Sequence, residues 1–244
     1  MKVVSYLKTV PAGNRNMQKP ELLRQFVNGV NAAGDIGILH DQNNLLDCDV
    51  GMIQGWVYDK TTTEHLRLRK TIIKTQKLNK KHSATADANL FLYHDKTNPH
   101  GYLRYSFDGV FPRTGQYCDS EIDPTRWLQI SKDTGINLQP YKTTGGHIVL
   151  MLQRNGGWSM GGLDVETWAI STIANIRRYT DRHIIIRSHP GDRFAKTYLK
   201  TLHNKLRGHH SLSISRIGTP YEKDMQNAWA VVNHNSSAAV GPII

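Results

Sequence analysis

Short apolar runs alternate with longer periodic stretches along the second half of the chain. The runs are bounded by glycine or polar residues and predict strands at 146–153, 183–190, 211–217 and 229–237. Apolar residues at helical spacing predict the intervening helices over 164–180, 192–208 and 219–228. Asp164 stands where an N-cap is expected, just before the first of these helices. Regular strand–helix alternation is typical of a parallel sheet with right-handed crossovers, so this half is expected to be Rossmann-like.

The first half shows the same alternation less clearly. Strands are expected at 2–10, at 35–41 or 49–57, and at 89–95, with helices over 19–34 and 61–80. Residues 96–145 are rich in proline and glycine and are expected to be irregular. The predicted fold class is therefore α/β, with an N-terminal Rossmann-like domain at 1–140 and a C-terminal one at 141–244.

The charge of the chain adds information about partners. There are 31 Lys and Arg against 20 Asp and Glu, a formal net charge of +11. Such a positive field attracts polyanions such as nucleic acid, although a solvated basic surface without a specific partner is the alternative. No apolar run is long enough for a membrane span. Cys48 and Cys118 lack the spacing of a metal site and are expected to be reduced thiols, so a cytoplasmic protein is predicted.

Polar residues gather at the predicted carboxyl ends of three strands, where open α/β sheets bind ligands. The clusters are Arg154, Gly157, Trp158 and Ser159 after the first strand, Arg187 and His189 after the second, and Asn235, Ser236 and Ser237 after the last. Glycines allow close backbone approach, and free amides at a helix N-terminus attract anions. The arginine and histidine offer donors where a leaving group gathers negative charge. A phosphorylated ligand is therefore predicted at this edge.

Simpler interpretations of these residues stay open. Ser236 or Ser237 is equally well explained as a helix cap, and His189 as a solvated loop residue. The glycine-rich loop is equally well explained as a tight connection with Trp158 in the core. The pattern GxGxxG is absent, so a dinucleotide is not predicted. No cofactor and no metal are expected.

Two of these segments resemble a known family. "RSHPGD" (187–192), followed by "VVNHNSSAAVGPII" (231–244), resembles the donor domain of nucleotide-sugar glycosyltransferases with the GT-B fold. In the capsule-polysaccharide and CDP-glycerol transferase groups one strand ends in Arg-x-His-Pro and a later strand in Asn- or Tyr-Ser-Ser/Thr. The whole chain, with "GGWSMGG" and "TDRHIIIRSHP", is also similar to phage-encoded proteins of glycosyltransferase type.

The resemblance implies two Rossmann-like domains facing a cleft. Arg187 and His189 would contact the diphosphate or sugar of the donor, expected to be a UDP-sugar. Asn235, Ser236 and Ser237 would hold the phosphates, with the loop 154–159 across the cleft. The family continues past the Ser-Ser helix with a Glu-Gly-x-Pro-like turn and a closing helix. The C-terminal domain is therefore expected to be truncated, or to lack the usual last wall of its donor site.

The N-terminal half would then bind the acceptor. The expected contacts are Arg15 and Lys19 in the loop 9–20, and His94 and Arg104 in the segment 93–113. Aromatic residues among the basic residues of 93–113 suit stacking on bases and contact with phosphates, and suit sugar rings equally well. A long loop packed against the sheet by these aromatics is the alternative.

An inverting mechanism also needs a general base on the acceptor hydroxyl. Asp95 and Asp108 are the candidates, with His40 or Asp41 behind them, and His189 is the third candidate catalytic residue. Each aspartate is equally typical of a turn. The helix 61–80 carries a basic face, which is either a solvated surface or the border of a polyanion track.

The predicted function is a glycosyltransferase that moves a sugar from a nucleotide-sugar to a hydroxymethylated base in phage DNA. Positive net charge favours double-stranded DNA as the acceptor. If the protein is phage-encoded, the host cytoplasm is the expected compartment. One alternative is a cell-surface polysaccharide or teichoic-acid-type transferase of glycosyl or glycerophosphate groups. The other is a non-catalytic α/β module that binds nucleic acid.

Overall fold

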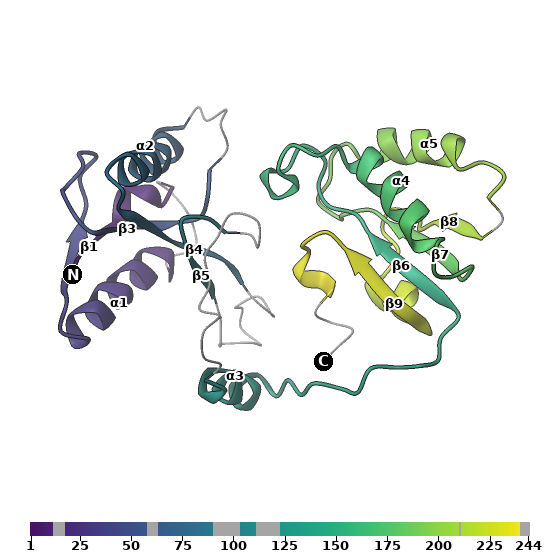
Figure 1. Cartoon of the computed structure of the whole chain (residues 1–244), viewed down its shortest axis with the longest axis horizontal. Helices are drawn as coiled ribbons and strands as arrows, with labels where there is room; N and C mark the ends of the chain where they lie inside the picture. Colours follow the sequence, from purple (N-terminus) through teal and green to yellow (C-terminus); the bar gives the residue numbers. More distant parts are fainter. Residues whose placement is uncertain (12–17, 58–62, 90–102, 111–122, 210, 240–244) are drawn as a thin grey trace. The chain divides into compact units, whose positions relative to one another are not determined.

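The computed structural model describes residues 1–11, 18–57, 63–89, 103–110, 123–209 and 211–239. The chain divides into two compact units, Met1–Thr134 and Gly135–Ile244. Each unit is built around its own sheet, with helices packed on it (Figure 1). The α/β class predicted from the sequence is therefore confirmed.

The N-terminal sheet has five strands in the order β2-β1-β3-β4-β5. Its strands are β1 (Lys2–Tyr6), β2 (Ile36–His40), β3 (Val50–Gln54), β4 (His82–Asn89) and β5 (Leu103–Phe107). Its helices are η1 (Leu7–Thr9), α1 (Gln18–Ala32), α2 (Glu64–Leu78) and α3 (Thr125–Thr134). The first four strands are parallel and β5 is antiparallel to β4. Because β2 and β3 lie on opposite sides of β1, the carboxyl ends of β1 and β3 form a topological switch point.

α1 and α2 cover opposite faces of this sheet (Figure 1). Val3 and Met52 pack with Leu23 of α1, whereas Val4 and Ile53 belong to the cluster under α2. Both central strands are thus buried on two sides, which explains why they appear in the sequence as continuous apolar runs.

The C-terminal sheet has four parallel strands in the order β8-β7-β6-β9. Its strands are β6 (His147–Met151), β7 (His183–Arg187), β8 (Leu212–Ile214) and β9 (Ala228–Asn233). Its helices are η2 (Trp158–Met160), α4 (Val165–Ile176), α5 (Ala195–Lys205), α6 (Tyr221–Met225) and η3 (Ser237–Ala239). This order is that of one half of a Rossmann fold, with its switch point between β6 and β9.

α4 and α5 pack on one face of the C-terminal sheet (Figure 1). Ile148, Leu150, Ile184 and Ile186 point to this side and are buried against the helices. The predicted N-cap of α4 is present, because an Asp164 side-chain oxygen accepts a hydrogen bond from the Thr167 amide at 2.9 Å. That bond helps to hold the pKa of Asp164 below its usual range.

The first half of the structure adds elements that the sequence did not predict. The strand expected at 89–95 lies, after Asn89, outside the described residues, whereas a strand that was not predicted runs over His82–Asn89. Its sequence, HSATADAN, gives no hydrophobic signal, yet Ala84 and Ala86 are buried because small side chains fit beneath α1. The stretch 96–145, expected to be irregular, contains β5 and α3. Both 35–41 and 49–57 contain a strand, rather than one of the two.

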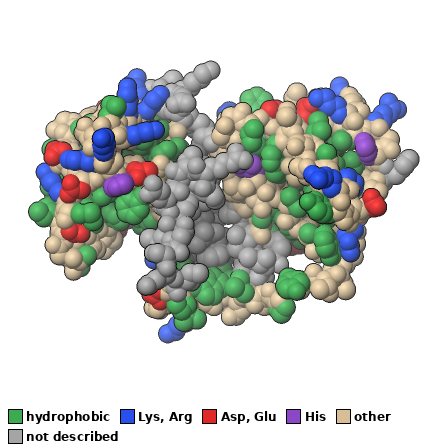
Figure 2. Space-filling model, viewed as in Figure 1, with side chains coloured by type: hydrophobic (Ala, Val, Ile, Leu, Met, Phe, Trp, Pro, Cys, Tyr) green, Lys and Arg blue, Asp and Glu red, His purple; other side chains and the backbone are tan. Residues whose placement is uncertain are grey.

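Arg69 is the exception among the basic residues of α2. Lys and Arg side chains gather on the outer side of this helix (Figure 2), but Arg69 is only 6% exposed. Its Nε and Nη2 donate to the Thr9 carbonyl oxygen at 2.9 and 2.6 Å, and Nη2 also reaches Gln54 Oε1 at 3.3 Å. Burial lowers the pKa of this guanidinium to about 10. The N-terminal switch point is thus filled by a side chain of the protein itself.

We expect Arg69→Met to lower the free energy of unfolding by about 3 kcal/mol, because it leaves buried oxygen acceptors without their charged donor. Arg67→Met, which removes an exposed arginine from the same helix, should change it by less than about 0.5 kcal/mol. Chemical denaturation of both variants provides the measurement. Equal effects would contradict a structural role for Arg69.

Candidate functional site

The carboxyl ends of β6, β7 and β9 lie side by side at one edge of the C-terminal sheet. Met151, the last residue of β6, pairs with Arg187 of β7 on one side and with Asn233 of β9 on the other. The loops that follow these three strands therefore leave the sheet from the same edge, next to its switch point. This is the adjacency that the strand–helix alternation predicts, and it is where ligands bind in such sheets.

Asn155 fixes the loop after β6. Its side-chain oxygen accepts hydrogen bonds from the amides of Gly156 at 3.0 Å and Val165 at 3.3 Å. The loop turns through Gly156 at a φ of 69°, a left-handed conformation that glycine adopts without strain. The first residue of α4 and the start of the loop are thereby joined through one side chain.

Asp192 ties this loop to the start of α5. One carboxylate oxygen accepts from the Asn155 amide at 2.8 Å and the other from the Phe194 amide at 2.9 Å. The residue is only 9% exposed, and the hydroxyl of Tyr198 is buried nearby, where burial raises its pKa with a further contribution from the Asp192 charge. The loops after β6 and β7 are therefore held together by one buried carboxylate.

His189 and Arg154 lie close to each other, beside the hydrogen bonds that Asp192 accepts. Nδ1 of His189 accepts a hydrogen bond from the Gly191 amide at 3.0 Å, so the neutral ring carries its proton on Nε2. Burial, together with the charge of Arg154, lowers the pKa of His189, against the opposing effect of Asp192. A Cβ on Gly191 would lie 2.7 Å from Arg154 Nη2, so glycine leaves room for the guanidinium beside the turn.

Two donors at this edge have no partner among the described residues. The guanidinium of exposed Arg154 makes no hydrogen bond or ion pair with any of them, and neither does Nε2 of His189. Both groups stand over a backbone fixed by Asp192. The edge therefore offers positive charge and N–H donors to an incoming anion.

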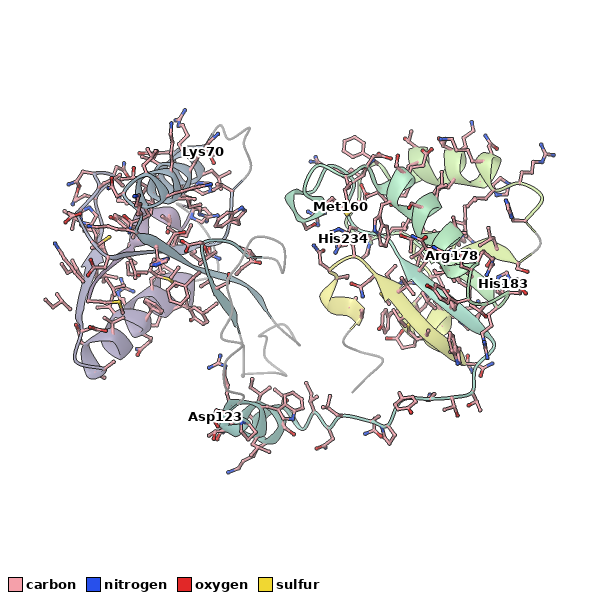
Figure 3. All side chains as sticks on the ribbon, in the orientation of Figure 1. Lys70, Asp123, Met160, Arg178, His183 and His234 are labelled. Carbon is pink, nitrogen blue, oxygen red and sulfur yellow. The ribbon has the colours of Figure 1, made fainter. Side chains whose placement is uncertain are left out.

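Asn235, which follows β9, also holds the loop after β6 through hydrogen bonds. Asn235 donates to the Ser159 carbonyl oxygen at 2.8 Å and accepts from Gln153 Nε2. Met160, which is buried, and His234 lie near this end of the sheet (Figure 3). The Ser236 hydroxyl accepts from the Ala238 amide at 3.3 Å, which is the helix-capping contact proposed as the alternative to phosphate binding.

Arg187 is placed differently from the prediction that it contacts a donor. Its guanidinium forms an ion pair with Asp224 of α6 and donates to the Thr219 carbonyl oxygen at 2.9 Å. The two paired side chains are 16% and 8% exposed. Since Ile186 faces α4 and α5, Arg187 points to the opposite face of the sheet. The sequence contains no signal for this contact, because Asp224 lies in a short polar helix thirty-seven residues away.

Asp108, the candidate base that the structure describes, is also engaged. Its carboxylate accepts from the Ser83 amide at 2.9 Å and lies 2.6 Å from His82 Nδ1. His82 begins β4, so this cluster lies at the amino edge of the parallel strands, away from the carboxyl ends of β1 and β3. These contacts are those of a residue closing a turn.

Most of the other predicted residues, or their side chains, lie outside the described part of the structure. Arg15, His94 and Asp95 lie outside the described residues. Lys19 belongs to α1, Arg104 to β5, Trp158 to η2 and Ser237 to η3, and the side chains of these four lie outside the described part of the structure. Gly157 sits in the loop after β6, with its amide donating to the Arg154 carbonyl oxygen at 3.0 Å.

Comparisons with known proteins give no family for this chain. No protein-family model matches the sequence, and no curated protein matches it. The glycosyltransferase resemblance therefore stays a prediction, and the candidate site rests on geometry.

Metal ligands and membrane spans can be assessed for the part of the chain that the structure describes. No group of three or more His, Cys, Asp and Glu side chains there could hold a metal ion. None of the helices there is both long and apolar enough to cross a bilayer.

Arg154 and Arg187, both at the carboxyl edge of the C-terminal sheet, should respond differently to substitution. Arg187→Ala removes the partner of a buried carboxylate and should lower the free energy of unfolding by about 3–5 kcal/mol. Arg154→Ala should change it by less than about 0.5 kcal/mol, because that side chain is exposed and unpaired among the described residues. Denaturant titrations measure both, and a tolerated Arg187→Ala would mean that the ion pair is dispensable.

Acid should weaken the fold through His189. Its pKa is lower in the folded protein than the usual 6.5, so its contribution is complete above that pH and is lost as the pH falls through the folded pKa. His189→Asn keeps an acceptor for the Gly191 amide but cannot titrate. Its stability should therefore decline less between pH 7 and 5 than that of the parent, measured by denaturation across that range. Exposed His203→Asn is the control, and an equal slope for both variants would refute the assignment.

Proposed function

We propose that the chain is a glycosyltransferase that binds its nucleotide-sugar donor at the carboxyl edge of β6, β7 and β9. The observation that carries this proposal is the pair formed by the Arg154 guanidinium and His189 Nε2, neither of which has a partner among the described residues. They stand next to a Rossmann-type switch point, the position at which this class of sheet binds nucleotides.

The chemistry of the two groups fits a diphosphate. A guanidinium donates two parallel hydrogen bonds to phosphate oxygens, and a neutral imidazole adds one N–H donor from Nε2. When the bond between the sugar and the phosphate oxygen breaks, that oxygen takes the electron pair and becomes more negative. Arg154 then stabilises the leaving nucleoside diphosphate, because its charge is already in place before the reaction.

Asp192 and Asn235 act in this proposal as positioning residues. Asp192 bonds to the amide of Asn155, directly after Arg154, and lies three residues after His189. Asn235 holds the Ser159 end of the loop. Arg187 is assigned to the ion pair with Asp224 rather than to the donor.

The acceptor is proposed to bind on the N-terminal unit and the donor on the C-terminal unit, as in GT-B enzymes. Asp95 stays the proposed general base, since Asp108 is held by Ser83 and His82. A net charge of +11 supports double-stranded phage DNA with a hydroxymethylated base as the acceptor, in the host cytoplasm. A cell-surface polysaccharide or teichoic-acid-type acceptor is the alternative within the enzyme class.

Calorimetry with UDP and with UDP-glucose tests the donor site. We expect binding of both, weakened about 10- to 100-fold by Arg154→Ala, which corresponds to the loss of one charged hydrogen-bonding group. Arg178→Ala is the matched control, because Arg178 lies just past the carboxyl-terminal end of α4 (Figure 3), at the other edge of the sheet. No binding of UDP, CDP or their sugar conjugates at millimolar concentration would reject the donor site and leave the nucleic-acid-binding module as the better explanation.

A further inference from the structure

The outer face of α2 carries a row of basic side chains that the donor site does not use. Arg67, Lys70, Lys74 and Lys77 follow one another at intervals of three, four and three residues, with Lys80 just past the end of the helix. Because residues three and four apart share a helix face, the first four form a single stripe, about 15 Å long at 1.5 Å per residue. Together these five residues are called the α2 basic face.

The stripe lies opposite the packed side of the helix. Leu68, Arg69, Ile72 and Gln76 are the buried residues of α2, and they occupy the intervening positions. Figure 2 shows Lys and Arg side chains gathered over α2, and Figure 3 labels Lys70 on this helix. The basic face is therefore presented outward on a rigid element anchored in the core.

Most of this face has no acidic partner among the described residues of the chain. Glu64 is the one acid within α2, and its carboxylate accepts from Asn43 at the start of the helix. Lys81, beyond the face, takes Asp47 as its partner at 2.6 Å. Arg67, Lys74 and Lys77 form no ion pair with any described residue.

Electrostatic repulsion within this row of like charges destabilises the helix, and a bound polyanion removes it. Like charges three or four residues apart on a helix repel one another and destabilise it. A bound row of phosphates converts that repulsion into attraction and releases counterions from the nucleic acid. A bilayer surface fits less well, because the apolar side of α2 is buried in the core and is not available for insertion.

We propose that the α2 basic face binds the phosphodiester backbone of duplex DNA. Its straight, regular row of cations matches a rod that carries one charge per 3.4 Å along each strand. The inference deepens the proposed function, on which it rests for the identity of the acceptor, by naming the surface that would hold DNA. No base contacts are assigned to α2, so binding through this face is independent of sequence.

The test is fluorescence anisotropy of a labelled 20-base-pair duplex between 50 and 200 mM NaCl. The triple variant Arg67→Gln/Lys74→Gln/Lys77→Gln removes three exposed charges without disturbing the core. We expect at least a tenfold loss of affinity at 50 mM salt. The slope of log affinity against log salt should also become shallower by about 2–3, because each phosphate that the protein neutralises contributes about 0.9 to that slope.

A matched control separates this surface from net charge. Lys196→Gln/Lys200→Gln/Lys223→Gln removes three exposed lysines from α5 and α6 of the C-terminal unit. It should change DNA affinity by less than threefold, and circular dichroism should show both triple variants folded. Equal losses in the two variants, no binding of the duplex at 50 mM salt, or tighter binding of polyglutamate or of anionic vesicles would overturn the proposal.

UDP calorimetry on the same variants distinguishes the two proposals. The α2 triple variant should bind UDP as the parent does, because α2 belongs to the other unit. For that variant we expect DNA binding to be lost and UDP binding to be unchanged. If the parent binds DNA through α2 but no nucleotide, the donor proposal fails and the α2 proposal stands. If it binds nucleotide but no DNA, the α2 proposal fails together with DNA as the acceptor, and the donor site stands.

Discussion

The buried carboxylate of Asp192 is the contact on which the candidate site depends. It accepts hydrogen bonds from the amides of Asn155 and Phe194, which belong to the loops after β6 and β7. Arg154 directly precedes the first of these amides, and His189 lies in the turn that leads to the second. Two flexible side chains can form a site only if their backbones are held in place, and a charged acceptor with two amide donors does this well.

Burial and pairing separate Arg69 and Arg187, which support the fold, from Arg154, which is available to a ligand at the edge of the C-terminal sheet. Arg69 fills the switch point of the N-terminal sheet with bonds to Thr9 and Gln54. Arg187 forms an ion pair with Asp224. Arg154 is exposed and unpaired among the described residues, at the second switch point. The same residue type thus serves two purposes, and the free energy of exposing or burying its charge determines which one.

The adjacency of the three strand ends could be predicted from the sequence, but the contacts of the side chains at those ends could not. Parallel crossovers bring strand ends to a common edge, so Arg154, His189 and Asn235 were expected together and their strands are adjacent. Arg187 was expected with them, yet alternation along β7 turns its side chain to the other face. Asp192 was not predicted as an anchor, because the two amides that it binds come from segments far apart in sequence.

By itself the sequence determined the α/β class, the strand–helix alternation of the C-terminal half and the basic face of α2. These follow from local periodicity and charge, which need no knowledge of distant residues. Only the tertiary structure decided that HSATADAN is a strand, that β5 pairs antiparallel at the sheet edge, and which arginines are paired. The reason is physical: small residues become strand only when neighbouring elements bury them, and an ion pair exists only where folding brings its two partners within reach.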